Sequence, residues 1–495
     1  MINELLIDKK YSIKIYSTHI EVFPYTKNDS PKVEKMFSKW DDVTHQYIPI
    51  GYYIENHVLY LPRGVSLNLL ANEFNANPIK DGINYVDSCE NIKTKIDMNY
   101  KPRDTIQEDS IDFLTSKGRF TKGNYYNQYG LNLDTGAGKT YCMISAIADL
   151  NLKAIVITHK TRLRDQWYSE FINKSDITES RVIVIDSSNE MNKIMNDELE
   201  GDIYLVNHQT LASYARMNSW EALHDFFKKI KVGIKVVDEA HRFFENSLMI
   251  DYFSNVKRNY YLTATFTRSD PKEIRIFERA YSSLYRFGEE TLQYEGVRKH
   301  INLVCTTFQS RPSIYTIAQI VGGRYGFNTF KYIDYELKNN ERNSMLRVIE
   351  NILLKVNRLK GKILIIAPKI DSLDIIADYI KDCTNKSIGI VHSKKSDEEK
   401  EAAMNCDIII ATIKGIGEGD DIKGLRVLIN TEPIGSKALA DQLRGRLRPY
   451  SDTDDTYLFY LVDLGIDYVY QMFKRHRSVF EKKCKEIIML NMEVW

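Results

Sequence analysis

The stretch at residues 135–140, with the sequence TGAGKT, carries the clearest chemical signal in the chain. It lies between an apolar lead-in at residues 131–133 and an apolar pattern with helical spacing. Its two glycines let successive backbone N–H groups point at an anion, and the lysine and threonine that follow suit the outer phosphates and Mg²⁺ of a nucleotide. Because Leu133 stands where the strict pattern requires glycine, the match is to the shorter T-G-x-G-K-T form. The stretch predicts a phosphate-binding loop; a loop that holds no nucleotide is the alternative.

Two adjacent carboxylates form a second chemical group. Asp238 and Glu239 directly follow the strand-like run 234–237. At the end of a strand, the first carboxylate can hold Mg²⁺ through water, and the second can orient or deprotonate an attacking water. A solvated acidic turn is the alternative, but the upstream phosphate loop favours nucleotide hydrolysis.

Two weaker signals belong to the same chemistry. Gln107 lies ahead of a helical pattern, about 30 residues before Lys139. Its amide both donates and accepts, so it can read the edge of an adenine. The run 442–448 has three arginines within five positions, which suit phosphate binding but also occur on solvated faces.

The elements that would position these groups read as two α/β series. The runs 154–158, 182–185 and 203–207 are apolar at consecutive positions, as in a parallel sheet buried on both faces. Helical patterns alternate with these runs, and a second series of strands and helices begins near residue 362. Open parallel sheets bind ligands at the carboxyl ends of their strands, which places residues 207–211 at a binding edge. Residues 1–95 have alternating strands typical of a smaller α/β unit, for packing or for DNA contact.

Composition sets outer limits. The chain of 495 residues has 43% hydrophobic and 27% charged residues, which describes globular protein of two to four domains. The net charge of +1 gives no support of its own to nucleic-acid binding. No apolar run is long enough to cross a membrane. Six scattered cysteines and the lack of a signal-peptide pattern at the start predict a cytoplasmic protein.

Taken together, the motifs at 135–140, 238–241, 263–265 and 442–448 resemble those of a superfamily 2 helicase, in the same order. The resemblance covers roughly residues 100 to 470, and it is strongest to the compact DNA helicases of phages, the UvsW type. It implies an α/β protein with two tandem RecA-like domains with parallel sheets, with ATP and Mg²⁺ in the cleft between them. The domains expected are a small N-terminal α/β domain at 1–95, RecA-like domain 1 at 96–290, and RecA-like domain 2 with a closing C-terminal helix at 291–495.

The resemblance also implies roles for individual residues. The residues assigned to catalysis are Lys139, Asp238, Glu239, Gln442, Arg446 and Arg448. Those assigned to the nucleotide are Gln107, Thr135, Gly136, Ala137, Gly138, Lys139, Thr140 and Asp421, with Thr140 and Asp238 as the Mg²⁺ ligands. Those expected to couple the ATP state to domain movement are His241, Thr263 and Thr265. Those expected at the nucleic acid are Thr158, Arg162, Gln166, His208, Gln209 and Thr412.

Three departures from the family pattern leave questions open. Asp134 places a carboxylate beside the expected phosphates, where the family has a small residue or proline. Residues 103–107 are a loose form of the glutamine motif. In the arginine motif, Pro449 occupies the second arginine position and Arg448 lies one residue earlier, so the identity of the arginine finger stays open.

The resulting hypothesis is an ATP-driven DNA motor, monomeric and moving 3′→5′. Its expected substrates are forks, Holliday junctions and R-loops, RNA–DNA hybrids included, in replication, recombination or repair within a phage-infected host cell. An RNA helicase is the alternative within the same class, since the motifs do not select the nucleic acid. A binding module with a decayed ATPase would show damaged ligand positions, yet Lys139, Thr140, Asp238 and Glu239 are all present. A P-loop kinase would leave the second α/β series unexplained.

Overall fold

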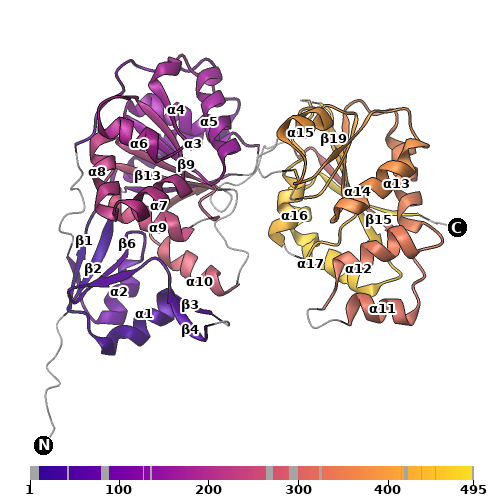
Figure 1. Ribbon diagram of the computed structural model, residues 1–495, viewed down its shortest axis with the longest axis horizontal. Helices are drawn as coiled ribbons and strands as arrows, with labels where there is room; N and C mark the ends of the chain where they lie inside the picture. The colour runs from indigo at the N-terminus through magenta and orange to yellow at the C-terminus, as the bar shows by residue number, and fades with distance from the viewer. Residues whose placement is uncertain are drawn as a thin grey trace, which may run out of the picture. The chain divides into compact units, whose positions relative to one another are not determined.

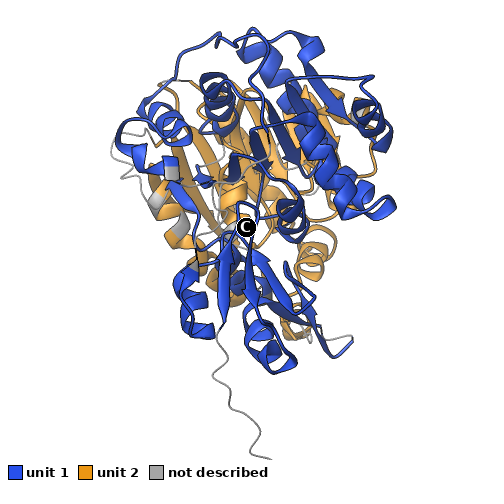
Figure 2. Cartoon of the chain, turned by 90° about the vertical axis from the view of Figure 1, so that its left-hand side faces the viewer, with its two compact units in different colours: residues 1–294 blue, residues 295–495 orange. Residues whose placement is uncertain are grey.

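The chain forms two compact units, residues 1–294 and 295–495 (Figure 2). The computed structural model describes residues 11–41, 44–79, 88–125, 127–133, 136–242, 244–263, 271–288, 299–322, 326–413, 415–416, 422–435, 437–451 and 453–492. Each unit is built around one seven-stranded sheet. Among the described residues, no helix combines the length and apolarity that a membrane span requires.

The sheet of the first unit is parallel throughout, in the order β10-β11-β9-β12-β13-β8-β14. Figure 1 shows this unit, with β9 and β13 of the sheet labelled. Its strands have consecutive apolar residues because helices cover both faces, so that every residue of β8 and β9 is buried. The strands are β8 Gln128–Asn132, β9 Ala154–Thr158, β10 Val182–Ile185, β11 Ile203–Asn207, β12 Ile234–Asp238, β13 Arg258–Thr263 and β14 Tyr285–Gly288.

Two hydrophobic clusters lie on opposite faces of this sheet. Along β9, Ala154 and Val156 belong to one cluster, whereas Ile155 and Ile157 belong to the other. Alternate residues of a strand point to opposite faces, so this division defines a three-layer α/β unit. The helices are α3 Thr105–Thr115, α4 Lys139–Leu150, α5 Thr161–Lys174, α6 Ser188–Met195, α7 His208–Met217, α8 Trp220–Ile230, α9 Phe244–Phe253 and α10 Pro271–Ala280.

A smaller sheet at the N-terminus belongs to the same unit. Its order is β5-β6-β2-β1-β7, antiparallel except where β7 joins β1. A separate hairpin pairs β3 with β4. The elements are β1 Ser12–Ile15, β2 His19–Phe23, α1 Ser30–Phe37, β3 Ser38–Asp41, β4 Gln46–Pro49, β5 Tyr53–Glu55, β6 Val58–Pro62, α2 Leu67–Phe74 and β7 Pro78–Ile79.

The N-terminal sheet shares a core with the first parallel sheet. Tyr252 on α9 donates its hydroxyl to Gly51 O at 2.8 Å and to Tyr60 O at 3.1 Å. A Cβ at Gly51 would collide with Leu248, so the backbone there lies directly against α9. One hydrophobic cluster contains residues of both sheets. The N-terminal sheet is therefore packed into the first unit over a continuous apolar core.

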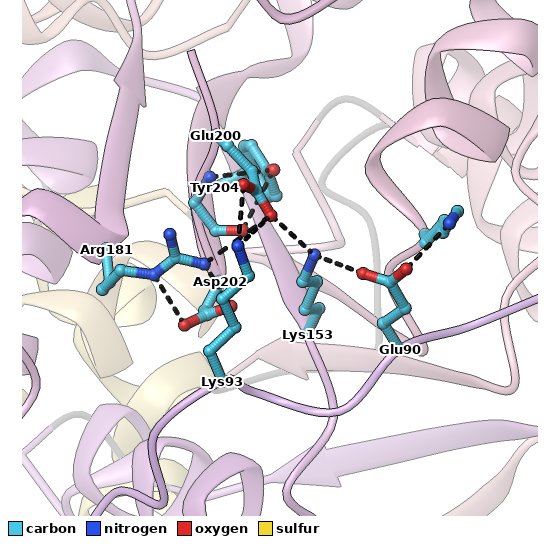
Figure 3. A network of polar contacts seen from close by, with 9 residues as sticks. Glu90, Lys93, Lys153, Arg181, Glu200, Asp202 and Tyr204 are labelled. Carbon is cyan, nitrogen blue, oxygen red and sulfur yellow. Dashed lines mark hydrogen bonds and ion pairs between the residues drawn. The ribbon is translucent and has the colours of Figure 1, made fainter. Parts of the chain in front are cut away.

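A polar network joins Glu90 and Lys93 to residues beside the parallel sheet (Figure 3). Glu90 accepts hydrogen bonds from Lys153 at 2.6 Å and from Lys231 at 2.8 Å. Glu200 accepts from Lys93 at 2.8 Å and contacts Lys153 at 3.5 Å. Lys153 is buried immediately before β9, so these carboxylates satisfy its charge and fasten the segment at 88–93 to the start of the sheet.

The second unit repeats the parallel architecture, with strand order β17-β18-β16-β19-β20-β15-β21. The predicted fold class, two tandem RecA-like domains with a small N-terminal α/β domain, is confirmed. Its strands are β15 Ile301–Phe308, β16 Lys362–Ile366, β17 Ile388–Val391, β18 Ile408–Ala411, β19 Leu425–Asn430, β20 Thr456–Asp463 and β21 Glu486–Asn491. Its helices are α11 Ile314–Val321, α12 Thr329–Asp334, a π-helix at Tyr335–Asn339, α13 Ser344–Val356, α14 Ile370–Lys381, α15 Asp397–Met404, α16 Lys437–Arg444 and α17 Asp467–Lys483.

The second unit differs from expectation at both of its ends. Its sheet begins with β15, well before the start near residue 362 that the sequence indicated. The basic helix expected to close the chain is α17, but β21 follows it and pairs in parallel with β15. The predicted domain boundaries themselves stay a prediction.

Candidate functional site

The phosphate-binding loop lies between β8 and α4, at the carboxyl end of the first sheet. Gly136 and Gly138 have φ of +86° and +90°, a left-handed conformation that favours glycine. Lys139 begins α4, so backbone N–H groups at the start of this 12-residue helix are directed toward the loop. The Lys139 ammonium donates to Leu133 O at 2.8 Å. Thr135 and Asp134 lie outside the described residues.

Gln107 braces this loop from α3. Its side chain is buried, with Nε2 donating to Ala137 O at 3.1 Å and Oε1 accepting from Arg103 N at 2.9 Å. A Cβ on Gly138 would collide with Gln107 Nε2, so the residue at 138 must be glycine for the amide to lie there. The amide thus binds the loop backbone, and its predicted contact with adenine stays a prediction.

The two carboxylates lie at the carboxyl end of β12. Asp238 Oδ2 accepts a hydrogen bond from Trp167 Nε1 at 2.9 Å, and Oδ1 accepts from the backbone N–H of Glu239 at 2.9 Å. Glu239 has a φ of +51°, and its carbonyl accepts from Arg242 N at 2.9 Å, which closes a tight turn.

Burial governs the protonation of both carboxylates. It raises the pKa of Asp238, against the opposing effects of the Trp167 hydrogen bond and the Lys139 charge. Burial also raises the pKa of Glu239 to about 6; the Lys139 charge opposes this rise and the Asp238 charge adds to it. A carboxylate with a pKa this close to neutrality suits a general base.

His241 connects the carboxylate turn to the neighbouring strand. Its Nδ1 lies 2.8 Å from Thr263 Oγ1 on β13 and 3.3 Å from Glu239 Oε2. Ala240 N also donates to Leu262 O at 3.1 Å. The turn is therefore tied to β13, as a coupling role for His241 and Thr263 requires. Thr265 lies outside the described residues.

In the first unit, the residues expected at the nucleic acid lie at or after the ends of β9 and β11, which pair side by side. Thr158 pairs in register with Asn207, and its hydroxyl donates to Asn207 Oδ1 at 2.9 Å. Thr158 and His208 are both buried. Among these residues of the first unit, Arg162, Gln166 and Gln209 are more exposed and can contact a nucleic-acid backbone.

In the second unit, three of the expected residues lie on or just after α16. Arg446 donates to Ile416 O at 3.0 Å, while Gln442 and Arg448 are partly exposed. Arg444, from the same cluster, is buried and forms an ion pair with Asp441 at 2.9 Å, so its role is structural rather than phosphate binding. Thr412 follows β18 and accepts from Gly415 N at 2.9 Å, and Asp421 lies outside the described residues.

Sequence reasoning missed Trp167, which contacts the expected metal carboxylate directly. The two residues are 71 positions apart, and nothing local to Trp167 signals the contact.

The described residues fit a Mg²⁺-nucleotide. The left-handed glycines shape the loop ahead of α4, and a lysine, a threonine hydroxyl and a carboxylate supply the groups that phosphates and Mg²⁺ prefer.

Comparison with known proteins agrees with this geometry. Residues 88–268 match the family described as type III restriction enzyme, res subunit, and residues 343–448 match the helicase conserved C-terminal domain. The chain belongs to the superfamily 2 helicases.

Three relatives illustrate the similarity. A putative ATP-dependent RNA helicase of Acanthamoeba polyphaga mimivirus is 23% identical over 363 residues. The aligned part is 71% of this chain and 63% of the relative. The chain thus spans less than two thirds of that relative's length. T4 UvsW is similar over 98% of this chain and 100% of its own, with 15% identity and a TM-score of 0.38. A variant of S. cerevisiae Dbp5 bound to Gle1 and IP6 is similar over 78% of this chain and 88% of its own, with 13% identity and a TM-score of 0.50, a likeness in fold alone.

Proposed function

We propose that the protein is an ATP-driven DNA helicase or translocase that unwinds or branch-migrates branched DNA, such as forks, Holliday junctions and R-loops. The observation that carries the proposal is the assembly of Lys139, Asp238 and Glu239 at one edge of one sheet, with each of these three ligand positions occupied by the expected residue type. This observation argues against a decayed ATPase. The 3′→5′ direction, a monomeric state and a role in recombination or repair rest on the resemblance to phage DNA helicases.

Each site residue of the first unit has a defined role in this proposal. The N–H groups at the start of α4 and the Lys139 ammonium bind the phosphates, and Thr140 and Asp238 would hold Mg²⁺. When bound, Mg²⁺ supplies positive charge against the negative charge that develops on the phosphates. Glu239 orients water and accepts its proton. His241 contacts both Glu239 and Thr263 and so links the Glu239 carboxylate to β13.

The second unit contributes through Gln442 and either Arg446 or Arg448, by the same family resemblance. An arginine finger of this kind is worth about 10³–10⁵ in rate in other nucleotide hydrolases. Because Pro449 displaces the family spacing, both arginines remain candidates for the finger.

An RNA helicase is the second candidate, favoured by one specific observation. The mimiviral relative is named as an RNA helicase. The small N-terminal domain, which the phage DNA helicases also have, favours DNA.

The proposal is tested by ATPase assays over a panel of fork, four-way junction, R-loop and RNA substrates. We expect stimulation by branched DNA above that by RNA. The change Lys139→Ala should reduce the stimulated ATPase to background while DNA binding is retained, because it removes the phosphate charge and leaves the exposed nucleic-acid residues in place. Lys193→Ala, an exposed lysine on α6, is the matched control and should behave as wild type.

Two outcomes would overturn parts of the proposal. If no DNA or RNA stimulates the wild-type ATPase, the motor function fails. If RNA stimulates it more strongly than every branched DNA, the RNA helicase takes the place of the DNA helicase.

A further inference from the structure

The indole of Trp167 makes a contact that packing alone does not require. Trp167 is 1% exposed on α5 and lies in the hydrophobic cluster that covers one face of the first sheet. A buried indole N–H needs an acceptor, and most acceptors in such a place are backbone carbonyls. Here the acceptor is the Asp238 carboxylate, at 2.9 Å.

This contact completes the restraint of Asp238. Its other oxygen, Oδ1, already accepts from the Glu239 backbone N–H. An ionised carboxylate offers about four lone-pair sites, so one donor on each oxygen fixes the plane of the group and leaves roughly one site on each oxygen for a hydrated cation. Partners of this kind orient the ligands of a metal, and their loss typically costs about 10–100-fold in metal affinity.

We infer that Trp167 is a positioning residue for the reaction, which holds the Asp238 carboxylate in the orientation that Mg²⁺ requires. The inference rests on the proposed Mg²⁺-nucleotide site. It assigns to the indole N–H a function toward the metal that is separate from the packing of the ring.

The position of Trp167 on α5 gives this contact a second consequence. The same helix begins at Thr161 and presents Arg162 and Gln166, two of the residues expected at the nucleic acid. A displacement of α5 by bound nucleic acid would act on Asp238 through the indole. Trp167 thus joins the helix that carries Arg162 and Gln166 to the Asp238 carboxylate.

The test measures the Mg²⁺ dependence of nucleotide binding rather than turnover. Binding of a fluorescent ADP analogue is titrated with Mg²⁺ in the wild type, Trp167→Phe, Asp238→Asn and the double variant, and is repeated in EDTA. We expect Trp167→Phe to raise the Mg²⁺ concentration at half effect about 10-fold and to leave binding in EDTA unchanged, because the ring and the phosphate loop remain. Trp220→Phe is the matched control: its indole stacks on Phe253 at 5.1 Å, and its Mg²⁺ dependence should equal that of the wild type.

The double variant separates positioning from packing. If the indole acts through the carboxylate, Trp167→Phe should change nothing further once Asp238→Asn is present, since interacting residues give non-additive effects. An unchanged Mg²⁺ dependence in Trp167→Phe, or an equal loss of binding with and without Mg²⁺, would overturn the inference. If the wild type itself shows no Mg²⁺-dependent nucleotide binding, the proposed function fails instead.

Discussion

The protonation of Glu239 sets a pH limit on catalysis. Burial raises the pKa of this carboxyl to about 6, so the group is protonated below that pH and cannot accept a proton from water. We expect the kcat of the nucleic-acid-stimulated ATPase to be level above pH 7 and to fall about tenfold per pH unit below pH 6. Steady-state rates from pH 5 to 8 measure this.

Two controls accompany the pH profile. Glu239→Gln cannot titrate and should have a low rate without this acidic limb. An unchanged kcat at pH 5 in the wild type would contradict the role of Glu239 as the base.

Whether a site residue could be predicted depends on how far along the chain its contact partners lie. Lys139, Asp238 and Glu239 could be predicted because each is part of a short local pattern of strand, turn and helix. The contact between Gln107 and Ala137 O spans 30 positions, and that between Trp167 and Asp238 spans 71. Such contacts depend on which elements pack together, which local patterns do not encode.

At the scale of elements, the π-helix at Tyr335–Asn339 contains a carboxyl that should control the stability of the second unit. Glu336 is fully buried, and burial, together with the nearby Asp463 charge, raises its pKa to about 8 from an ordinary value of 4.5. Because the folded state holds this proton more tightly than the unfolded state, stability should fall as pH rises from about 4.5 to about 8, by at most about 1.4 kcal/mol per pH unit.

Thermal unfolding between pH 5 and 9 measures this loss. Glu336→Gln, which keeps the shape and carries no charge, should flatten the decline, since Asn340 Nδ2 donates to Glu336 Oε2 at 3.2 Å and can donate to an amide oxygen as well. Glu341→Gln, at an exposed neighbouring position, is the control. A wild-type protein equally stable at both ends of the range would refute the assignment.

The elements that the sequence revealed are those with the strongest patterns. The central strands β9, β11 and β16 were found because they have four or more consecutive apolar residues. Edge strand β21 is largely exposed along its length, and β7 has two residues, so neither has a pattern that distinguishes it from a loop. Helix α11 is apolar, yet its residues Ile314 and Tyr315 are each 84% exposed. An apolar helical pattern predicts burial in a core, so the sequence does not indicate this exposure.

At the scale of the whole chain, the N-terminal sheet should be indispensable to the first unit. It shares one hydrophobic cluster with α9 and α10, to which Leu248 and Phe277 belong. Tyr252 on α9 stacks edge-on against Tyr53 of β5 and donates its hydroxyl to Gly51 O and Tyr60 O. Full burial of such a side chain contributes about 1.5–3 kcal/mol, so their sum rivals the 5–15 kcal/mol that typically stabilises a domain. Deletion of residues 1–87 should therefore leave a first unit that binds hydrophobic dyes and lacks a cooperative thermal transition.

A single substitution tests the same contact in a milder way, because the truncated protein could fail to fold for other reasons. Tyr252→Phe removes the hydroxyl that satisfies Gly51 O and Tyr60 O and should cost about 1–3 kcal/mol. Ile54→Ser, on an exposed strand of the same sheet, should cost little. A truncated protein that melts at the temperature of the full chain would show the N-terminal sheet to be a separate module.

Gly51 and Gly64, which lie at the shared core, determine whether the N-terminal sheet can be replaced by that of a related protein. A Cβ at Gly51 would collide with Leu248, and one at Gly64 would collide with Ala280 O. At Gly64 the obstructing atom is backbone, and at Gly51 the Leu248 side chain would have to move and the φ of +69° would be strained, so a side chain at either position would require the facing helix to shift or repack. In a chimaera, residues 11–79 should therefore transplant successfully only when residues 244–284 come from the same parent.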